Sequence, residues 1–399
     1  MLSVSPIRLG RVSRRLMMVF AIAAVSLCGA GAYYHTLTRG GPNVSALRQD
    51  LLTQFDVSFP GRGVTDYPGN TVDDVPKAYA MVVKAELLPA VVRTKGVSAR
   101  ARNAAKFLLE HSDERRDGFP GWGVPLAWDP YGDGSINRAH TKYTISTAIV
   151  LDALLDWLEA DKGVSKEPVL SIIRGAIRPY LEDAVLSPSG LLPYSLEPVD
   201  RRYDTFNPAA YLAGVMQRYS RIEADAELAR RIQSVADKTV AAHLAHRQVA
   251  ANGSWYWHYS VSEPVPNDLA HAGYVILGLQ MYAQHGGALR ERLDLAAIEK
   301  HLADFLDPAS GKLTAWPNFR TDANTPARSY DLGMGLYLVC KSSVPQWRAA
   351  YLAALPSYRT ASGAYSKYPP MPGRTELVVR EYETYILLGL AACVPSGSR

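Results

Sequence analysis

The stretch DLAHAGYVILGLQMY, at Asp268–Tyr282, decides the fold because four other segments of the chain follow the same pattern. Each segment begins with polar or charged residues and continues with the small and aliphatic residues of a buried helix. The other four segments are Thr141–Trp157, Asn207–Tyr219, Arg328–Val339 and Glu381–Ala392. Successive starts lie 66, 61, 60 and 53 residues apart, so the sequence repeats one structural unit.

Two other features recur between these segments. More amphipathic, charged helices are expected at Pro168–Leu186, Ile222–His246, Leu293–Phe305 and Gln346–Ala354, and a helical pair near Val75–Pro89 and Ser98–His111 opens the series. After each charged helix, a turn signal precedes a short aromatic stretch that is expected to be a small strand or extended loop. These stretches are Ser189-Gly190 before LLPYS, Asn252-Gly253 before SWYWHYS, Ser310-Gly311 before KLTAWPN and Ser362-Gly363 before AYSKYP.

The two interleaved repeats predict an all-α fold, an (α/α)6-like toroid with apolar helices inside and charged helices outside. This order places the aromatic stretches and the polar helix starts at the same mouth of the ring, where a binding cavity is expected. Four tryptophans are expected to bound that cavity: Trp128, Trp255, Trp257 and Trp316. An open α-solenoid is the competing architecture, because the repeat period alone does not determine closure.

The composition is that of a globular protein with ample core, since 48% of the 399 residues are hydrophobic and 20% are charged. The net charge of +5 is small, and several arginines near the N-terminus account for most of it, so the body lacks the basic footprint of a nucleic-acid-binding protein. The 23 tyrosines and seven tryptophans suit the faces and edges of sugar rings. Large helical proteins, however, also use tyrosine in their cores.

The N-terminus has the pattern of an export signal, because an Arg-rich stretch precedes the apolar run Leu16–Tyr34. Ala30-Gly31-Ala32 fits a cleavage site, whereas the 19-residue length of the run also allows an uncleaved membrane anchor. The body is therefore expected to be periplasmic or extracytoplasmic, anchored to the inner membrane if the run is retained. The predicted domains are residues 1–35 (signal or anchor), 36–60 (linker) and 61–399 (toroid).

The cysteines do not indicate a zinc site, because no CxxC or Cys/His spacing is present. Cys28 lies in the targeting segment. Cys340 and Cys393 both end predicted helices, so they can pair in an oxidising compartment or remain as buried thiols.

A 20-residue loop, Gly118–Asn137, precedes the first matching helix and is rich in glycine, tryptophan and aspartate. Loops of this length in compact domains are usually functional. Asp129 and Asp133 are candidate catalytic carboxylates, and Trp122 and Trp128 are candidate sugar-binding faces. The two aspartates also suggest calcium, but the loop lacks the alternating ligands of a calcium loop, so no metal or cofactor is assigned.

The aromatic stretch before Asp268 provides the second candidate group. Asp268, His271 and Tyr274 are spaced i, i+3 and i+6, so they can share one helix face. His and Tyr can act as acid and base, with a carboxylate orienting the imidazole. The structural alternative is that Asp268 caps the helix and His271 is a packing residue. Tyr256 is a further catalytic candidate. The substrate-binding candidates in the same stretch are Trp255, Trp257 and His258.

Polar residues at the starts of the other repeated helices complete the predicted site. They are Tyr203, Asp204 and Asn207; Trp316, Arg328, Tyr330 and Asp331; and Tyr368, Arg380, Glu381 and Tyr382. Glu381 is a candidate catalytic carboxylate, and Arg328 and Arg380 could clamp a sugar carboxylate. Each alone is readily explained as a cap, salt bridge or surface group, but several polar helix starts at one cavity favour a site.

Two kinds of chemistry are open to such residues. Two carboxylates on opposite sides, such as Asp129 or Asp133 against Asp268 or Glu381, would permit glycoside hydrolysis. A Tyr/His/Arg set would instead permit proton abstraction beside a uronate carboxylate, which is lyase or epimerase chemistry. The sequence contains no Ser nucleophile elbow, dinucleotide fingerprint, phosphate-binding loop or HExxH zinc helix.

Part of this pattern resembles the C-terminal helical region of D-glucuronyl C5-epimerases, over about Tyr203–Ala392. The likeness rests on an aromatic stretch before a helix that opens with Asp and His: Trp255-Tyr256-x-His258-Tyr259, then Pro266-x-Asp268-x-x-His271-x-x-Tyr274. More broadly, the sequence is similar to (α/α) toroid glycoside hydrolases and polysaccharide lyases. The resemblance implies a uronate-containing or other polysaccharide as substrate.

The resulting expectation is an exported carbohydrate-active enzyme, glycoside hydrolase-like, that cleaves or modifies an envelope or extracellular polysaccharide. The alternatives are a uronate C5-epimerase or polysaccharide lyase, and a non-catalytic glycan-binding or scaffold component of polysaccharide export. The expected partners are a polysaccharide or oligosaccharide, and the membrane if the N-terminal segment is uncleaved, with no nucleic acid.

Overall fold

The computed structural model describes residues 42–182, 185–320, 325–373 and 375–395. The chain divides into two units, residues 1–42 and 43–399, and the second holds all the elements described below. The export segment predicted at residues 1–35, including Leu16–Tyr34, lies outside the described residues. Within the described part, no helix combines the length and apolar character that crossing a bilayer requires.

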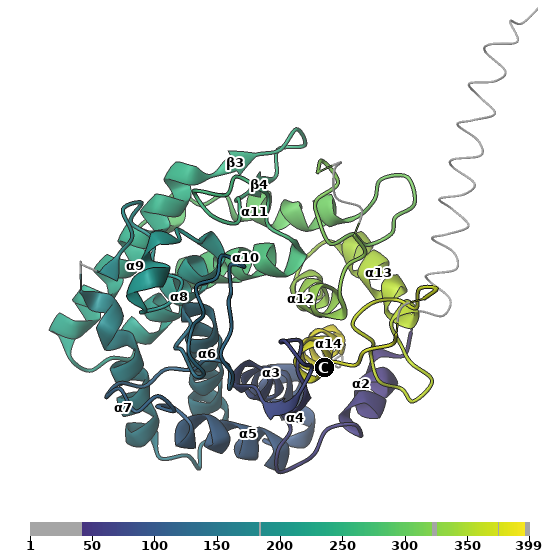
Figure 1. The fold of residues 1–399 in the computed structure, drawn as a ribbon, viewed down its shortest axis with the longest axis horizontal. Coiled ribbons are helices and arrows are strands. Elements are labelled where there is room, and N and C mark those ends of the chain that lie inside the picture. Colours follow the sequence, from purple (N-terminus) through teal and green to yellow (C-terminus); the bar gives the residue numbers. More distant parts are fainter. Residues whose placement is uncertain (1–41, 183–184, 321–324, 374, 396–399) are drawn as a thin grey trace, which may run out of the picture. The chain divides into compact units, whose positions relative to one another are not determined.

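Six inner helices form a closed ring (Figure 1). They are α3 (Pro76–Leu87), α6 (Thr144–Ala160), α8 (Phe206–Ser220), α10 (Leu269–Gln284), α12 (Ser329–Val339) and α14 (Arg380–Cys393). Each packs against the next, and α14 packs against α3. This closure decides between the toroid and the open solenoid, and it confirms the five repeated segments as inner helices.

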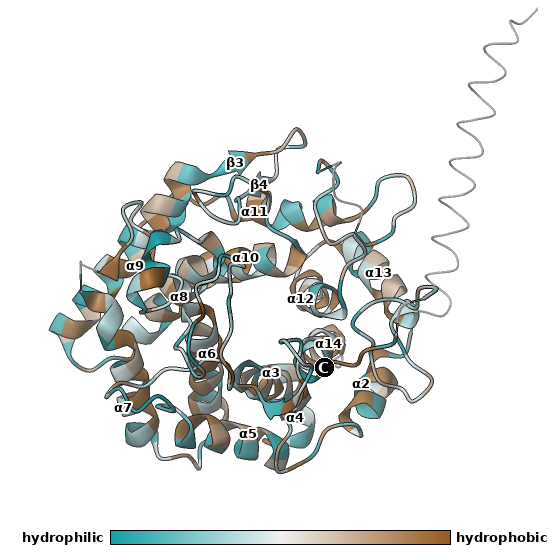
Figure 2. Cartoon of the chain, viewed as in Figure 1, coloured by the Kyte–Doolittle hydropathy of each residue, from teal (hydrophilic) through white to brown (hydrophobic). Residues whose placement is uncertain are grey.

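Outer helices cover the inner ring, one against each inner helix. They are α2 (Val44–Leu52), α5 (Ala99–Glu110), α7 (Lys166–Ile177), α9 (Ala226–His246), α11 (Leu295–Lys300) and α13 (Pro345–Ala354), with the short α4 (Pro89–Lys95) between α3 and α5. The outer helices bury only one face and present hydrophilic residues at the perimeter (Figure 2). The charged segments are therefore outer helices, as predicted.

The stretch at residues 36–60, interpreted from sequence as a linker, contains α2. This helix is part of the ring, because it packs against α14 and its Arg48 forms a buried ion pair with Glu86 at the end of α3. Its nine residues are too short and too polar to stand out as an amphipathic helix in the sequence.

Glycines allow two pairs of inner helices to approach closely. A Cβ at Gly214 or Gly278 would overlap the backbone of the facing helix, so α8 and α10 can pack only with glycine at these positions. Gly333 has the same role between α12 and α14, where it faces the backbone of Tyr385. The small residues that mark the repeated segments in the sequence thus account for the tightness of the ring.

The inner helices all begin at one end of the ring, here called the near mouth, and all end at the other, the far mouth. The aromatic stretches lie at the near mouth. In four repeats, an N–H at the start of an inner helix donates to a carbonyl of the next aromatic stretch, at 2.9–3.1 Å: Thr144 to Tyr194, Phe206 to Tyr259, Leu269 to Ala315 and Ser329 to Lys367. The stretches therefore occupy equivalent positions and satisfy donors that helix starts leave unpaired.

Little regular strand accompanies these loops. β1 (Arg62–Val64) pairs antiparallel with β2 (Val72–Asp74), and β3 (Gln248–Val249) with β4 (Trp255–Tyr256). Isolated bridges connect the other aromatic stretches to the residues before the inner helices, including Tyr143 to Ser195 and Ser366 to Val378. The predicted short strands are thus mostly extended loops.

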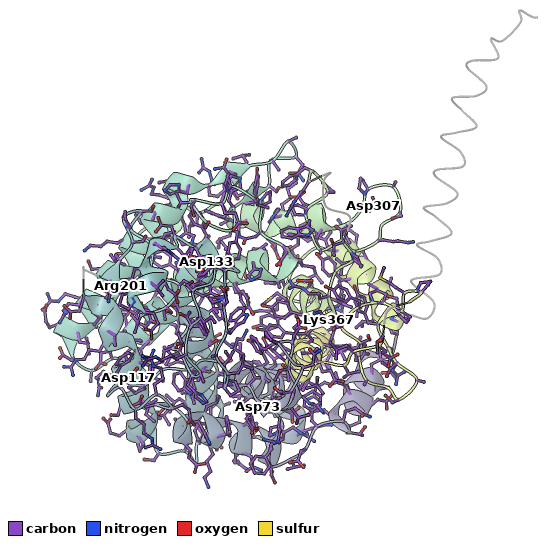
Figure 3. All side chains as sticks on the ribbon, viewed as in Figure 1. Asp73, Asp117, Asp133, Arg201, Asp307 and Lys367 are labelled. Carbon is purple, nitrogen blue, oxygen red and sulfur yellow. A yellow bond between two sulfur atoms is a disulfide. The ribbon has the colours of Figure 1, made fainter. Side chains whose placement is uncertain are left out.

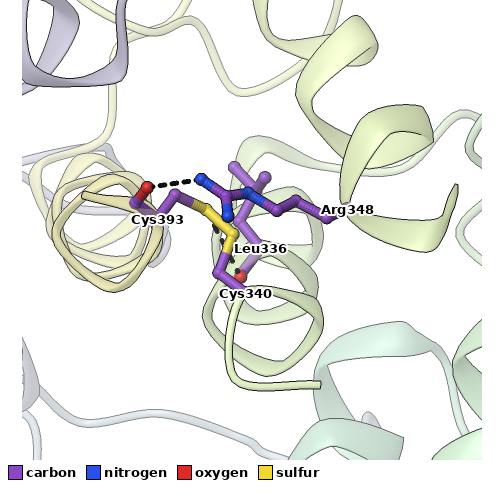
Figure 4. Close-up of a disulfide and its surroundings, with 4 residues drawn as sticks. All are labelled: Leu336, Cys340, Arg348 and Cys393. Carbon is purple, nitrogen blue, oxygen red and sulfur yellow. Dashed lines mark hydrogen bonds between the residues drawn. A yellow bond between two sulfur atoms is a disulfide. The ribbon is translucent and has the colours of Figure 1, made fainter. Parts of the chain in front are cut away.

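A disulfide joins the far ends of the last two inner helices (Figure 4). Cys340 follows α12 and Cys393 ends α14, with their Cα atoms 5.0 Å apart. Arg348 of α13 donates to the Cys393 carbonyl at 2.7 Å and ties the outer helix to the same point. Of the two states considered for these cysteines, the structure contains the pair.

Candidate functional site

The near mouth contains a cavity of about 100 Å³ that extends into the ring between the starts of the inner helices. Its lining is dominated by aromatic side chains from the inner helices and from the loops above them. The lining residues are Tyr67, Lys77, Val124, Trp128, Tyr143, Ile145, Ser146, Tyr194, Asn207, Tyr259, His271, Tyr274 and Tyr330. Aromatic faces with hydroxyl edges suit contact with a sugar ring.

His271 and Asp268, at the start of α10, form a hydrogen-bonded pair at this cavity. Asp268 caps the helix by accepting from the His271 backbone N–H at 3.0 Å, and its Oδ1 also lies 2.8 Å from His271 Nδ1. Its Oδ2 accepts from Arg328 at 2.8 Å. Asp268 therefore both caps the helix and contacts the His271 ring, because residues at i and i+3 lie on the same helix face.

The charge state of Asp268 follows from these contacts. Burial raises the pKa of its carboxyl, but the interactions with His271 and Arg328 outweigh burial and hold the pKa well below its usual range. The carboxylate therefore stays ionised and fixes the orientation of the ring. Among the described residues, His271 Nε2 has no hydrogen-bond partner, and His271 lines the cavity.

Three tyrosine hydroxyls meet close to His271, whose ring lies 6.4 Å from that of Tyr274. The Tyr274 hydroxyl forms short hydrogen bonds with those of Tyr330 and Tyr385. Burial raises the pKa of Tyr274 to about 12, and it raises the pKa values of Tyr330 and Tyr385 further. At neutral pH these tyrosines keep their protons, so they can donate hydrogen bonds but do not act as bases.

Two ion pairs flank the tyrosines. Lys77 of α3 lies 2.7 Å from Glu381 of α14, and both side chains are buried. Asp66 of the β1–β2 loop lies 2.5 Å from Lys367 and also accepts a short hydrogen bond from the Tyr382 hydroxyl. Lys367 lies over α12 and α14, across the ring from Asp133 (Figure 3).

Asn207, at the start of α8, differs from these residues because its amide is not satisfied. The residue is only 3% exposed and lines the cavity, yet its Nδ2 has no hydrogen-bond acceptor among the described residues. A buried amide N–H without a partner costs free energy comparable to a lost hydrogen bond. A bound ligand would supply the missing acceptor.

The structure thus brings together part of the predicted site. Six predicted residues line the cavity or are bonded directly to it through His271: Trp128, Asn207, Asp268, His271, Tyr274 and Tyr330. Arg328 bridges Asp268 to Asp331, at 2.8 Å from each, and Tyr382 stacks on Tyr330. Glu381 reaches the site through Lys77.

The other predicted tryptophans do not bound the cavity. Trp122 and Trp257 are buried, and their indole N–H groups donate to the carbonyls of Leu108 and His243, so both are core residues. Trp255 and Trp316 lie under Arg247 and Arg320 in cation–π contacts away from the cavity lining. The expected four-tryptophan rim is therefore wrong except for Trp128.

Several polar candidates instead hold their own loops together. Asp129 accepts from the backbone N–H groups of Gly132 and Gly134, and Asp133 lies 2.5 Å from Arg202 and accepts a short hydrogen bond from Tyr203. Asp204 accepts from Ser189 at 2.8 Å. The four candidates among these residues do not line the cavity: Asp129, Asp133, Tyr203 and Asp204.

Four further candidates lie elsewhere. Tyr256 packs against the rings of His301 and Phe319, and His258 lies beside it. Arg380 donates to the carbonyls of Arg62 and Gln54, so it ties α14 to the first hairpin and α2. Tyr368 lines a separate cleft of about 500 Å³ along residues 366–377, beyond Lys367.

The site also contains residues that sequence reasoning did not find. Lys77 lies at the start of α3 and Tyr67 in the β1–β2 loop before it, in a part of the chain without the aromatic stretch of the later repeats. Tyr143, Tyr194 and Tyr259 could have been found, because each immediately precedes an inner helix or lies in an aromatic stretch. Within the described ranges, no cluster of three or more His, Cys, Asp or Glu residues could hold a metal ion.

The far mouth holds a larger cavity of about 650 Å³, but the charged groups buried there are already paired with one another. Asp152, buried at its floor, forms ion pairs with Lys84 and Arg218 and accepts from the Tyr211 hydroxyl at 2.8 Å. Asp156 pairs with the same two cations, at 2.9 and 2.8 Å. Burial raises the pKa of Asp152, but the two cations outweigh burial and keep its pKa well below the usual range.

Comparisons with known proteins agree with this architecture. No family model and no curated protein sequence matches the chain. Similar solved structures include a GH76 α-mannanase from Bacteroides thetaiotaomicron, with 11% identity over 88% of this chain and 95% of that chain and a TM-score of 0.57. A cellobiose 2-epimerase from Spirochaeta thermophila has 15% identity over 88% and 97%, with a TM-score of 0.56. An α-amylase from Clostridium perfringens has 12% identity over 89% and 98%, with a TM-score of 0.59.

The chain has the (α/α)6 toroid fold. This confirms the predicted fold class and the broader likeness to toroid enzymes. At these identities the likeness establishes the fold, so the function has to be argued from the near mouth itself.

Proposed function

We propose that this chain is a carbohydrate-active enzyme that works by proton transfer at the near mouth, with His271 as the group that takes and gives the proton. The observation that carries the proposal is the orientation of His271. Asp268 holds Nδ1 at 2.8 Å, which leaves Nε2 on the side of an aromatic cavity. The toroid neighbours named as an α-mannanase, an epimerase and an α-amylase support carbohydrate as the substrate class.

The local chemistry suits abstraction and return of the proton on a sugar carbon beside a carbonyl group, such as the open-chain aldehyde of a reducing sugar, because the carbonyl oxygen takes up the negative charge that forms. With Nδ1–H donating to Asp268, Nε2 carries a lone pair and can accept a proton from the substrate. The ionised Asp268 then stabilises the imidazolium that forms. Tyr274 and Tyr330 keep their protons, so their hydroxyls can donate to a sugar oxygen on which negative charge develops. Epimerisation belongs to this class when the proton returns to the opposite face of the same carbon. This requires either that the planar intermediate turns in the cavity or that a second group, such as the Tyr259 hydroxyl in the lining, donates the proton.

Glycoside hydrolysis is the second candidate, since Asp268 and Glu381 bring two carboxylates to the same mouth from α10 and α14. Hydrolysis needs one carboxyl that holds a proton and one that does not. Here Asp268 is paired with Arg328 and Glu381 with Lys77, so one ion pair would have to open when the substrate binds. Because hydrolysis requires an ion pair to open, we propose it as the second candidate reaction, after proton transfer by His271.

The proposal includes an extracytoplasmic location and an envelope or extracellular polysaccharide as substrate. Disulfides form and persist in oxidising compartments, so the Cys340–Cys393 bond supports the export signal that the sequence predicts. The same proposal includes both forms of the N-terminal segment: a signal that is cleaved, or an anchor that holds the chain at the inner membrane.

The test is product analysis in D2O with a panel of oligosaccharides, comparing wild type with His271→Asn. NMR should show solvent deuterium at one sugar carbon of wild-type product, with unchanged chain length, and about 10²–10⁴-fold slower exchange in the variant. Shortened chains without deuterium at carbon would support hydrolysis, and a new unsaturated sugar would indicate a lyase. Saturable binding without turnover would overturn the enzyme proposal in favour of a glycan-binding protein.

A matched control separates chemistry from folding. His285 lies at the end of α10 and lines the far cavity, so His285→Asn changes the same residue type on the same helix. Wild-type activity in His285→Asn, with loss in His271→Asn, is the expected pattern. Equal activity in all three proteins would overturn the assignment of His271.

A further inference from the structure

The near mouth has no cation available to bind an acidic sugar. Among the described residues that line the cavity or contact its lining, the lysine and arginine side chains are each paired with a carboxylate. Lys77 is paired with Glu381, and Arg328, which lies over the Tyr330 ring, is paired with Asp268 and Asp331. Three carboxylates thus oppose these two cations, and His271 adds a positive charge only when it is protonated. A uronate carboxylate placed in this cavity would meet a net negative environment without a free partner.

Helix dipoles do not reverse this balance. The inner helices direct their partially positive N-terminal ends at the near mouth. Carboxylates already occupy the first turns of several of them: Asp268 caps α10, Asp331 lies in the first turn of α12, and Glu381 and Glu383 lie in that of α14. The positive ends of α10, α12 and α14 are therefore matched before any ligand arrives. Those of α3, α6 and α8, which have no acidic residue in their first turns, supply only partial charges.

Among the described residues that line the cavity, the buried polar atoms without a partner are neutral: the Tyr143 hydroxyl and the Asn207 amide. Asn207 is 3% exposed, lines the cavity and has no acceptor for its Nδ2. An amide N–H is a suitable donor to a sugar hydroxyl or ring oxygen, and it offers no charge to a carboxylate. Because a buried donor without a partner is costly, a site that retains one gains specificity when the correct ligand supplies the acceptor.

We infer that the cavity takes an uncharged sugar residue, with Asn207 donating a hydrogen bond to one of its oxygens and the Lys77–Glu381 pair excluding the corresponding uronic acid. This inference rests on the proposed function and narrows its substrate class. It also replaces the uronate substrate that the resemblance to glucuronyl epimerases implies. Elimination next to a uronate carboxylate is thereby disfavoured, since that reaction requires the carboxylate to be bound.

Matched sugar pairs test the inference on the full chain. The probes are the methyl glycosides of glucose, mannose and galactose and the three corresponding methyl uronides, with binding measured by saturation-transfer NMR and calorimetry. For the pair that binds, the neutral member should bind about tenfold or more tightly than its uronide, because one unfavourable charge contact is sufficient for that difference. Tighter binding of the uronide by wild type would overturn the inference.

Two variants assign the effect to residues. Asn207→Ala should weaken binding of the neutral glycoside about tenfold, the loss expected for one good hydrogen bond. Asn103→Ala on α5, distant from the cavity lining, is the matched control and should bind as wild type. Glu381→Gln leaves Lys77 without its carboxylate, so the preference for the neutral sugar should shrink or reverse. Unchanged binding in Asn207→Ala would overturn the role given to this amide.

The outcome is distinguishable from failure of the proposed function. If oligosaccharides are turned over but the uronides bind better, the enzyme proposal stands and the substrate inference is wrong. If no glycoside binds and His271→Asn changes no reaction, the enzyme proposal fails and the inference fails with it. If Glu381→Gln does not fold, the comparison of neutral and acidic probes on the wild-type protein still tests whether the cavity prefers the uncharged sugar.

Discussion

The two mouths of the ring differ in how their buried polar groups are satisfied. At the far mouth, Asp152, Asp156, Lys84, Arg218 and Tyr211 form one network, and none of them has a buried nitrogen or oxygen without a partner. At the near mouth, Asn207 has an unpaired Nδ2, and His271, whose Nε2 has no partner among the described residues, lines the cavity. Satisfied networks stabilise a fold, whereas unsatisfied groups beside a cavity indicate a ligand.

The two regions are also in contact, so the difference is not one of separate domains. The ring of Tyr211, at the far cavity, lies 5.8 Å from that of Tyr274, which lines the near cavity. One layer of tyrosines thus separates a structural half of the ring interior from a functional half. Substitutions on the far side should change mainly stability, and those on the near side mainly activity.

The largest stability effect is expected for Asp152→Asn. Removing this carboxylate leaves Lys84 and Arg218 buried with only Asp156 between them, which should lower the free energy of unfolding by about 3–5 kcal/mol. Denaturant unfolding of wild type and variant measures the difference. Asp156→Asn is the matched control and should cost less, because its side chain is 24% exposed. A loss below about 1 kcal/mol for Asp152→Asn would contradict the structural role of the far network.

The disulfide should contribute the next largest effect. The Cys340–Cys393 bond spans 53 residues and closes the ring at α12 and α14, so replacing both cysteines by serine should cost about 2–4 kcal/mol. Thermal unfolding with and without reductant gives an independent measurement on wild type, which should approach the variant when reduced. An unchanged Tm after verified reduction would show that the bond adds nothing to stability.

A smaller, pH-dependent effect is expected for Asp268→Asn at the near mouth. The folded-state pKa of Asp268 is depressed, so the stability it contributes is present above the unfolded pKa of about 3.9 and is lost as pH falls through the folded value. At pH 7 the variant should be less stable by about 1–3 kcal/mol, the value of a charge-assisted hydrogen bond. The difference between the two proteins should shrink as the pH is lowered below about 4. A difference that is independent of pH would contradict the assigned charge state.

Sequence reasoning recovered the ring because periodicity is a local property. The apolar repeats predicted α6, α8, α10, α12 and α14, and their small residues are the ones that permit close helix packing. The short α2 escaped detection because its stability comes from contacts with α14 and α3, which no local pattern reports.

The site was predicted only where local spacing determines geometry. Asp268 and His271 share a helix turn, so i, i+3 spacing was sufficient to pair them. Lys77 and Glu381 lie at opposite ends of the chain and meet only because α14 closes the ring onto α3. The tryptophans failed as markers because indole is as suited to a core as to a sugar, and only burial distinguishes Trp257 from Trp128.

The smallest stability effect and the clearest separation of the two mouths are expected for Asn207→Ala. Because Nδ2 has no partner in the protein, its removal forfeits no hydrogen bond and relieves an unpaired buried donor, so the free energy of unfolding should change by no more than about 0.5 kcal/mol or should rise. Catalysis or sugar binding should nevertheless fall. A clear loss of stability would mean that the amide serves the fold, as Asp152 does. Stability retained with function lost is the pattern that a polar group held ready for a ligand should give.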